Sequence, residues 1–220
     1  MNIEILHQES YPLAQITLAA QESFRAVGGT LVGMDTSVQL NIRPRESVLR
    51  SAGTASTPID FYEYRAMIKQ GNVLLASPLP GDIVINELGV GNSEMLIRPE
   101  SFWGADTRIR MRVEWRAAQR HSLNEGIRFV SLTGVGAFLL ALYGATHEVE
   151  LQAGASMLVS PGHLVGMTPS VTLTRRTISG KINLPHVVTT TMLEVDGPGK
   201  IIMQTHSARA LSEWVRDEVR

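Results

Sequence analysis

The chain has 220 residues, of which 44% are hydrophobic, so it is long enough to bury one large core or two smaller ones. Its 20 basic and 21 acidic side chains nearly cancel, which gives no reason to expect the whole surface to bind nucleic acid or an anionic membrane. The chain contains no cysteine, which excludes disulfides, thiol nucleophiles and thiolate metal sites, and this composition fits a reducing, cytoplasmic location.

The first ten residues, MNIEILHQES, have neither a basic leader nor an apolar stretch, so we expect no secretory signal. Further along, the phrase LVGMDTSVQL at 31–40 returns as LVGMTPSVTL at 164–173, identical at seven of ten positions. The match extends to Leu18–Leu40 and Leu151–Leu173, and a weaker copy runs over Leu88–Met111. Three similar segments in one chain predict a structure built from repeats.

The repeats have the pattern of β-strands. In RIRMRVEWR, residues 108–116, apolar side chains alternate with arginine and glutamate, which is typical of a strand with one buried face. The segment 43–57 is poor in apolar residues, and we expect it to be a loop between strands of the first unit. Because each unit has an apolar face that it cannot bury alone, we expect the three units to close on one another in a pseudo-threefold arrangement.

The most apolar run is FVSLTGVGAFLLALYGA at 129–145. It is shorter than the roughly 20 apolar residues of a spanning helix, and glycines interrupt it where strands would end. We therefore interpret it as a pair of buried strands and expect no transmembrane segment.

The C-terminal residues have helical periodicity. Ser207 can cap the segment ARALSEWVRDEVR, in which Leu211, Trp214, Val215 and Val219 share one face. We expect this helix to cover one opening of the β assembly, and the alternative is a docking helix for a partner. The expected organisation is thus a single all-β domain, residues 1–207, with units at about 1–70, 71–133 and 134–207, followed by the helix at 208–220.

Several motifs resemble the family named for altered inheritance of mitochondria, also called mitochondrial biogenesis proteins, and the chain is similar to its bacterial members. The motifs, in order, are LVGM at 31–34, PLPGDI at 78–83, GHLVGM at 162–167 and GPGKIIMQTHS at 197–207. The resemblance implies a fold like that of the tryptophan RNA-binding attenuation protein, with three β-sandwich or double-stranded β-helix units in tandem. It also implies a homotrimer that forms a ring of nine units, and no enzymatic activity.

The resemblance also implies a Gly-Glu turn late in each unit, which could form a contact or ligand site. Only the second unit retains a similar sequence, NEGIRF at 124–129, which makes Glu125 a candidate contact residue. His163 lies in the Gly-His-Leu motif. We interpret it as a turn histidine that hydrogen-bonds to backbone, and the alternative is a polar group in a pocket between units.

Other patterns give little evidence of chemistry. No two of the six histidines have the spacing of metal ligands, and we find no nucleophile elbow and no phosphate-binding loop, so we expect no metal and no cofactor. Arg108, Arg110 and Arg112 are expected on one strand face, where they either face solvent or an acidic neighbour, or bind phosphate. Only 5% of the residues are aromatic and none interleave with the arginines, so we do not expect nucleic-acid binding.

The sequence therefore favours a non-enzymatic, self-assembling β scaffold that binds an unidentified protein partner. The alternative is a regulatory protein that binds a small molecule in a pocket between repeats.

Overall fold

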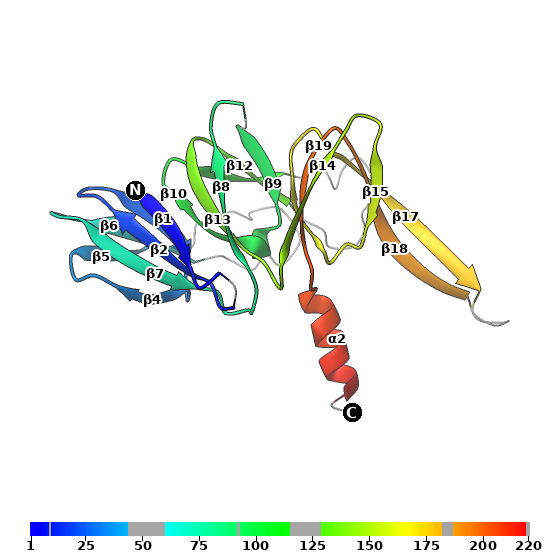
Figure 1. The fold of residues 1–220 in the computed structure, drawn as a ribbon, viewed down its shortest axis with the longest axis horizontal. Helices are drawn as coiled ribbons and strands as arrows, with labels where there is room; N and C mark the ends of the chain where they lie inside the picture. Colours follow the sequence, from blue (N-terminus) through cyan, green and yellow to red (C-terminus); the bar gives the residue numbers. More distant parts are fainter. Residues whose placement is uncertain (9, 44–59, 92, 115–128, 182–186, 219–220) are drawn as a thin grey trace.

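The computed structural model describes residues 1–8, 10–43, 60–91, 93–114, 129–181 and 187–218, and these residues are mostly β-strands (Figure 1). The expected all-β class with one short C-terminal helix is confirmed. The expected loop at 43–57 lies, apart from Arg43, outside the described residues. No helix of the described part is long and apolar enough to cross a membrane.

The strands follow one another in three groups after an N-terminal strand, β1 (Asn2–Leu6). The first group comprises β2 (Leu13–Leu18), β3 (Ser23–Val27), β4 (Leu31–Met34), β5 (Val38–Arg43), β6 (Phe61–Ala66) and β7 (Gly71–Ala76). The second comprises β8 (Ile83–Leu88), β9 (Glu94–Ile97), the 3-10 turn η1 (Pro99–Ser101), β10 (Phe102–Asp106), β11 (Arg110–Glu114), β12 (Phe129–Thr133) and β13 (Gly136–Ala141). The third comprises β14 (Thr146–Leu151), β15 (Ser156–Val159), β16 (Leu164–Met167), β17 (Thr172–Lys181), β18 (Val187–Asp196) and β19 (Gly199–Gln204).

The same order of strand pairing recurs in the three groups. In each, the last strand lies between the first and the third, as in β2–β7–β4, β8–β13–β10 and β14–β19–β16. The fifth strand likewise lies between the fourth and the second, as in β5–β6–β3, β11–β12–β9 and β17–β18–β15. Each third strand has a register shift at the same place, before Gly33, Gly104 and Gly166, which marks a β-bulge. β7 pairs with β2 and β4, so it belongs with the first group, whereas the expected unit boundary at residue 70 places it in the second.

Neighbouring groups share one kind of strand pairing, in which the second strand of a group pairs with the third strand of the next. β3 pairs with β10, with Ala26 opposite Gly104. β9 pairs with β16, with Ile97 opposite Gly166. These two pairings fuse three-stranded halves into two six-stranded sheets, and they leave a four-stranded and a three-stranded sheet at the ends.

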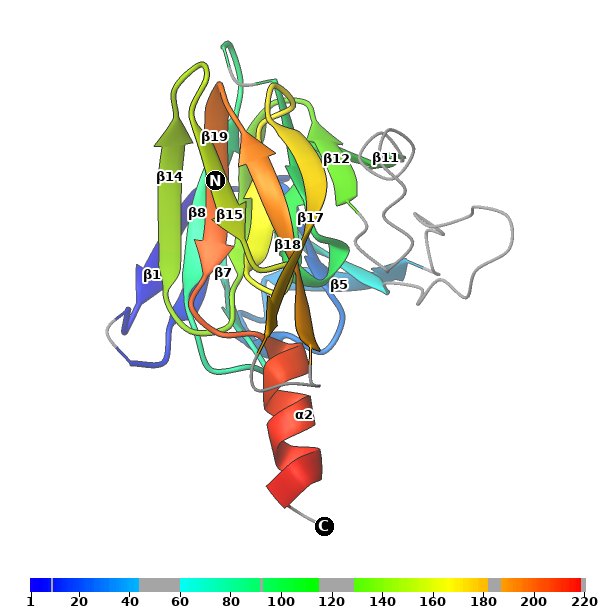
Figure 2. The same ribbon diagram turned by 90° about the vertical axis from the view of Figure 1, so that its right-hand side faces the viewer.

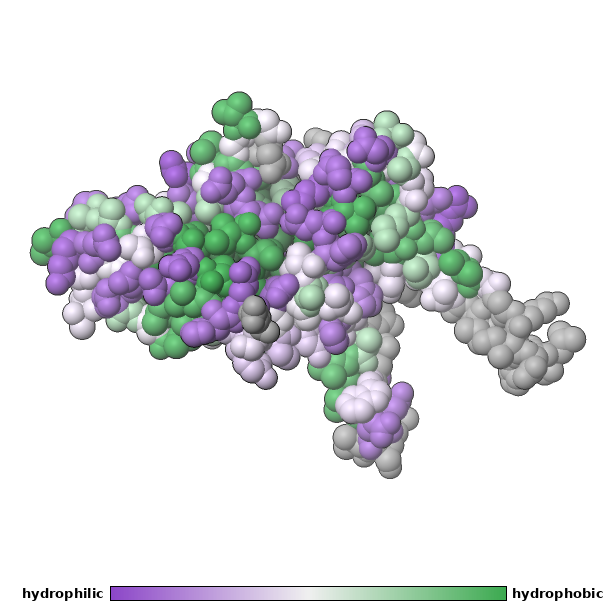
Figure 3. All heavy atoms as spheres, viewed as in Figure 1, coloured by the Kyte–Doolittle hydropathy of each residue, from purple (hydrophilic) through white to green (hydrophobic). Residues whose placement is uncertain are grey.

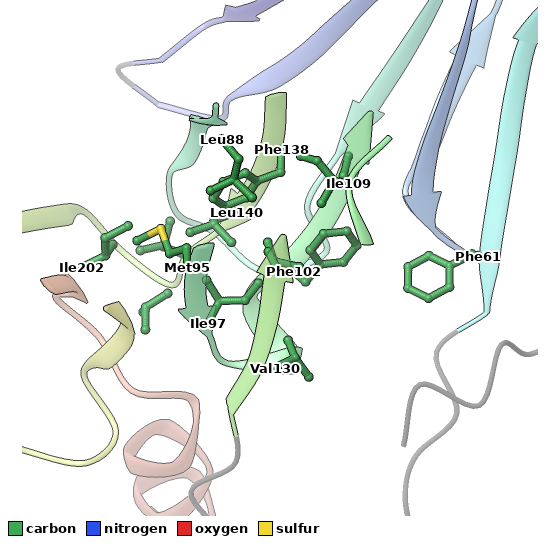
Figure 4. Packing of buried hydrophobic residues seen from close by; sticks show 14 residues of the cluster. Phe61, Leu88, Met95, Ile97, Phe102, Ile109, Val130, Phe138, Leu140 and Ile202 are labelled. Carbon is green, nitrogen blue, oxygen red and sulfur yellow. The ribbon is translucent and has the colours of Figure 1, made fainter. Parts of the chain in front are cut away.

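The sheets form successive layers with three hydrophobic cores between them. Strands of the first two sheets enclose the first core, which includes Ile16, Phe24 and Tyr64. Figure 4 shows residues of the second core, which come from several strands. The ring centroids of Phe61 and Phe102 lie 5.8 Å apart in an edge-to-face arrangement. The third core lies between the second six-stranded sheet and the terminal three-stranded sheet.

The central strand β13 is apolar along its whole length because both of its faces are buried. In β13, Phe138 and Leu140 enter the second core while Leu139 enters the first. This confirms the interpretation of the run at 129–145 as two buried strands, β12 and β13. A strand with two buried faces loses the alternating pattern and acquires the continuous hydrophobicity that a membrane span also has.

The three groups do not close on one another within the chain, which departs from the expected arrangement. The first and third groups lie at opposite ends of the long axis of the molecule (Figure 1). The reason is visible in the pairing: each junction uses one edge of a group, so a row of three leaves one edge open at each end.

The helix α2 (Ala208–Glu218) projects away from the sheets, and the expectation that it covers an opening of the assembly is wrong (Figures 1 and 2). Its start is as expected: the hydroxyl of Ser207 accepts a hydrogen bond from the backbone N of Ala210 at 3.4 Å. Its apolar residues Leu211, Trp214 and Val215 are all exposed.

The segments that leave each group run side by side and hydrogen-bond through their backbones. The N–H of Asp82 donates to the carbonyl of Gly144 at 2.8 Å, and Gly81 and Gly144 form a parallel bridge. One segment further on, the N–H of Thr205 donates to the carbonyl of Ala145 at 3.0 Å. We call this series of contacts the exit ladder.

Gly81 tests how tightly the exit ladder is packed. A β-carbon at this position would lie 2.0 Å from the carbonyl oxygen of Leu142, so Gly81→Ala requires the backbone to move. We expect a loss of about 1–3 kcal/mol in the free energy of unfolding, measured by urea denaturation. Gly89→Ala is the matched control, because its β-carbon meets no atom within 4 Å; equal stability of the two variants would contradict the prediction.

Candidate functional site

His163 lies in the turn before β16, where its ring is held by backbone. Its Nδ1 lies 2.8 Å from the carbonyl oxygen of Gln204, and its own carbonyl accepts from the N–H of Gln204 at 2.9 Å. The Gln204 side chain also donates to the carbonyl of Gly162 at 3.1 Å. The interpretation of His163 as a turn histidine that bonds to backbone is therefore confirmed, and these contacts attach the turn to the end of β19.

The expected arginine face is only partly formed. Arg110 and Arg112 are exposed on one face of the edge strand β11, but Arg108 lies in the turn before that strand, so its placement on the strand face is wrong. The reason is Asp106, whose carboxylate accepts hydrogen bonds from the backbone N and the guanidinium of Arg108 at 2.7 to 3.0 Å. Glu125 lies outside the described residues.

The pKa of Asp106 results from opposing effects. Burial of the carboxyl raises its pKa, but the hydrogen bonds and charge of Arg108 outweigh burial, so the pKa lies below its usual value. The ion pair fixes the turn between β10 and β11 and leaves Arg108 with an internal partner. Within the described part of the chain, no group of three or more His, Asp or Glu residues is placed to hold a metal ion.

One cleft of about 430 Å³ lies where the exit ladder meets the loop between β1 and β2. Tyr11, Asp82, Tyr143 and His206 contribute side chains to it, and the rings of Tyr143 and His206 are 5.2 Å apart. Several of its polar atoms already have structural partners. Asp82 Oδ2 accepts from the N–H of Thr146 at 2.7 Å, and His206 Nδ1 lies 3.0 Å from the hydroxyl of Thr205. The cleft is lined by both aromatic and polar residues, as small-molecule sites commonly are.

A second candidate site is the open edge of β4. Because the sequence of β4 is repeated in β16, the exposure of the same residue types can be compared in the two strands. Both β4 and β16 have the sequence LVGM. In β16, which pairs with β9, Val165 is 0% and Met167 2% exposed. In β4, which has no strand of the described chain beside this edge, Val32 is 61% and Met34 39% exposed. The valine and the methionine of the motif are therefore buried in β16 and exposed in β4.

The glycine of this motif also differs between the two environments. A β-carbon on Gly104 would lie 2.6 Å from the ring of Phe24, and one on Gly166 would lie 3.2 Å from Ile97. Phe24 lies in β3 and Ile97 in β9, so in both cases the contacting residue belongs to the neighbouring strand of the preceding group. A β-carbon on Gly33 meets no atom within 4 Å. Close approach of a neighbouring strand requires a glycine at 104, whereas nothing in a single chain requires it at 33.

The opposite end of the row has a matching open edge. β15 occupies the position of β3 and β9, the strands that join one group to the next. Its residues Met157 and Leu158 are 36% and 46% exposed, whereas the corresponding Met95 and Leu96 of β9 are buried. An unpaired strand edge with exposed apolar side chains is a surface suited to pairing with another strand. Sequence reasoning missed both edges, although the identity of the two LVGM motifs was the signal that could have found β4.

Comparison with known proteins identifies relatives over nearly the whole chain. The family model described as mitochondrial biogenesis AIM24 matches residues 3–206. The crystal structure of a protein from Streptococcus pyogenes is similar in fold, with a TM-score of 0.72 and 18% sequence identity over 99% of both chains. No curated protein matches the chain.

The lowered pKa of Asp106 gives a test of its role. A carboxyl whose pKa is depressed by folding stabilises the protein fully above its unfolded pKa, about 4, and loses this contribution as the pH falls through its folded value. Asp106→Asn retains an oxygen acceptor for the turn but not the charge. We expect lower stability than the wild type at pH 7, with the difference vanishing on acidification, measured by denaturation across pH. A constant difference down to pH 2 would contradict the assignment.

Proposed function

The chain belongs to the mitochondrial biogenesis AIM24 family, and from its open edges we propose that it is a non-enzymatic β scaffold that assembles from copies of itself and acts by binding partners. The observation that carries this proposal is the LVGM motif, which is buried under a neighbouring strand in β16 and uncovered in β4.

The proposal treats the three groups of strands as tandem modules of one design. The common pairing order and the common bulge before Gly33, Gly104 and Gly166 support this view. Modules inside the chain are joined by the second strand of one and the third strand of the next. The third module of one copy and the first module of another have these same two strands free, so they can join in the same way.

The internal junctions specify the register of the external one. Within the chain, Ile97 lies opposite Gly166 and Leu96 opposite Met167. The corresponding pairs between copies are Val159 with Gly33 and Leu158 with Met34. In this register the two exposed apolar residues, Leu158 and Met34, cover each other as Leu96 and Met167 do inside the chain.

The external junction also completes a core. Trp103 and Val165 occupy the position of Val32 in the second and third modules. Trp103 enters the core of the first module and Val165 enters the core of the second, so each third strand contributes one residue to the core behind it. Val32 can enter the third core of the neighbouring copy, and burial of its side chain there stabilises the contact by about 1.5–3 kcal/mol.

Such a junction is head-to-tail, and a head-to-tail contact forms a ring when its rotation closes. Three copies with three modules each form the nine-module ring that the family resemblance implies. A ring also removes the two open edges that a single chain exposes. We propose the trimer on these grounds.

A specific observation favours the alternative function, binding of a small molecule, namely the cleft lined by Tyr11, Tyr143 and His206. We rank it second because neighbouring protein atoms already engage the imidazole of His206 and the carboxylate of Asp82. A molecule retained by the wild type in native mass spectrometry, and lost from Tyr143→Ser, would support it.

The proposal predicts that Gly33→Val separates folding from assembly. The new side chain enters open space in a single chain but blocks a strand at the junction, as a β-carbon at Gly104 would. We expect a folded monomer by light scattering, where the wild type forms a trimer. Gly89→Val is the matched control, since its position is equally open but lies off both edges. A monomeric wild type, or a trimeric Gly33→Val, would overturn the proposal.

A further inference from the structure

The helix α2 has an apolar face that remains exposed among the residues that the structure describes. Leu211, Trp214 and Val215 are exposed, Trp214 by 61%. Figure 3 shows hydrophobic and polar residues on different sides of the projecting helix. Arg216, Asp217 and Glu218 are exposed and of mixed charge. A membrane-surface helix instead has a polar face rich in Lys and Arg, so these residues favour a protein partner.

A groove of about 260 Å³ is present on the same side of the sheets from which α2 projects. The groove lies between the loop before β2 and the connection from β7 to β8. Its lining includes Tyr11, Pro12, Pro78 and Leu79. Tyr11 is 76% and Leu79 44% exposed. Figure 1 shows that this connection and the start of α2 both lie at the lower side of the layers. The lining of the groove is mostly apolar.

The exit ladder relates the two surfaces. Each module's exit segment bonds to that of the module before it: Leu142 donates to the carbonyl of Asp82 at 2.9 Å, and Thr205 donates to that of Ala145 at 3.0 Å. Leu142 and Thr205 directly follow β13 and β19, as Ser77 follows β7. The next step of the ladder therefore brings Ser77–Leu79 of a second copy beside Ser207 and Ala208, where α2 begins.

We propose that α2 of one copy docks in the Tyr11–Leu79 groove of the next copy, and this inference rests on the proposed assembly. The occupant is a second copy because the ladder places its groove one strand spacing, about 4.8 Å, from the root of the helix. In the same chain, the exit segment of the second module lies between this groove and the segment from which α2 begins. Docking covers the exposed apolar residues of both surfaces and ties neighbouring copies at a point distant from the β4–β15 junction.

The absence of cysteine allows a specific test, because only introduced thiols react. The variant Leu79→Cys with Leu211→Cys is treated with a short bis-maleimide and separated under denaturing conditions. We expect covalent products of two and three chains. The control is Val90→Cys with Leu211→Cys, because Val90 is more exposed than Leu79 but does not line the groove, and this variant should stay monomeric. No product, or a link within one chain, overturns the inference.

A parallel variant separates this inference from the assembly on which it rests. Met34→Cys with Leu158→Cys reports the strand junction alone, and we expect it to cross-link between chains. Cross-linking there without cross-linking of Leu79→Cys with Leu211→Cys overturns the helix docking and leaves the assembly standing. Failure of both overturns both. All four residues are at least partly exposed, so the variants fold as the wild type does.

Discussion

The structure depends on one contact: the antiparallel pairing of the second strand of a group with the third strand of the next. It fuses half-sheets into six-stranded sheets. It also places Trp103 of β10 in the core of the first group and Val165 of β16 in the core of the second group. Because strands such as β13 contribute side chains to the cores on both sides of their sheet, stability is shared between neighbours. Among the described strands this contact is made twice, and its two halves remain without a partner strand at β4 and β15.

The sequence predicted much of the fold because repetition and alternation are local signals. The copies at Leu18, Leu88 and Leu151 each begin at the end of the first strand of a group. Alternation identified β11, and the apolar run at 129–145 identified two buried strands. The assignment of β7 to the first group could not be predicted, because pairing partners are a property of the tertiary structure. The helix was predicted, but its direction depends on the absence of a covering surface, which no local pattern encodes.

The candidate site was less predictable for a physical reason. His163 was identified by its motif, and its bonds to Gln204 agree with a structural role. Arg108 was misplaced because its hydrogen bonds to Asp106 hold it in a turn, so β11 begins at Arg110, two residues later than the alternation suggests. The open edges were missed because identical residues, such as Val32 and Val165, differ only in what lies beside them. A surface that is exposed only because a neighbouring strand is missing has no sequence pattern of its own. The one indication is that its residues repeat a motif that is buried elsewhere in the chain.

The central claim is that the β15 edge of one copy is complementary to the β4 edge of another. Mixing two variants tests it most directly: Gly33→Val, blocked at β4, and Leu158→Arg, blocked at β15. Each alone keeps one usable edge but has no partner for it, so native mass spectrometry should detect only monomers. An equimolar mixture should give a dimer with one copy of each and nothing larger. A mixture that stays monomeric, or a single variant that still assembles, would contradict the account.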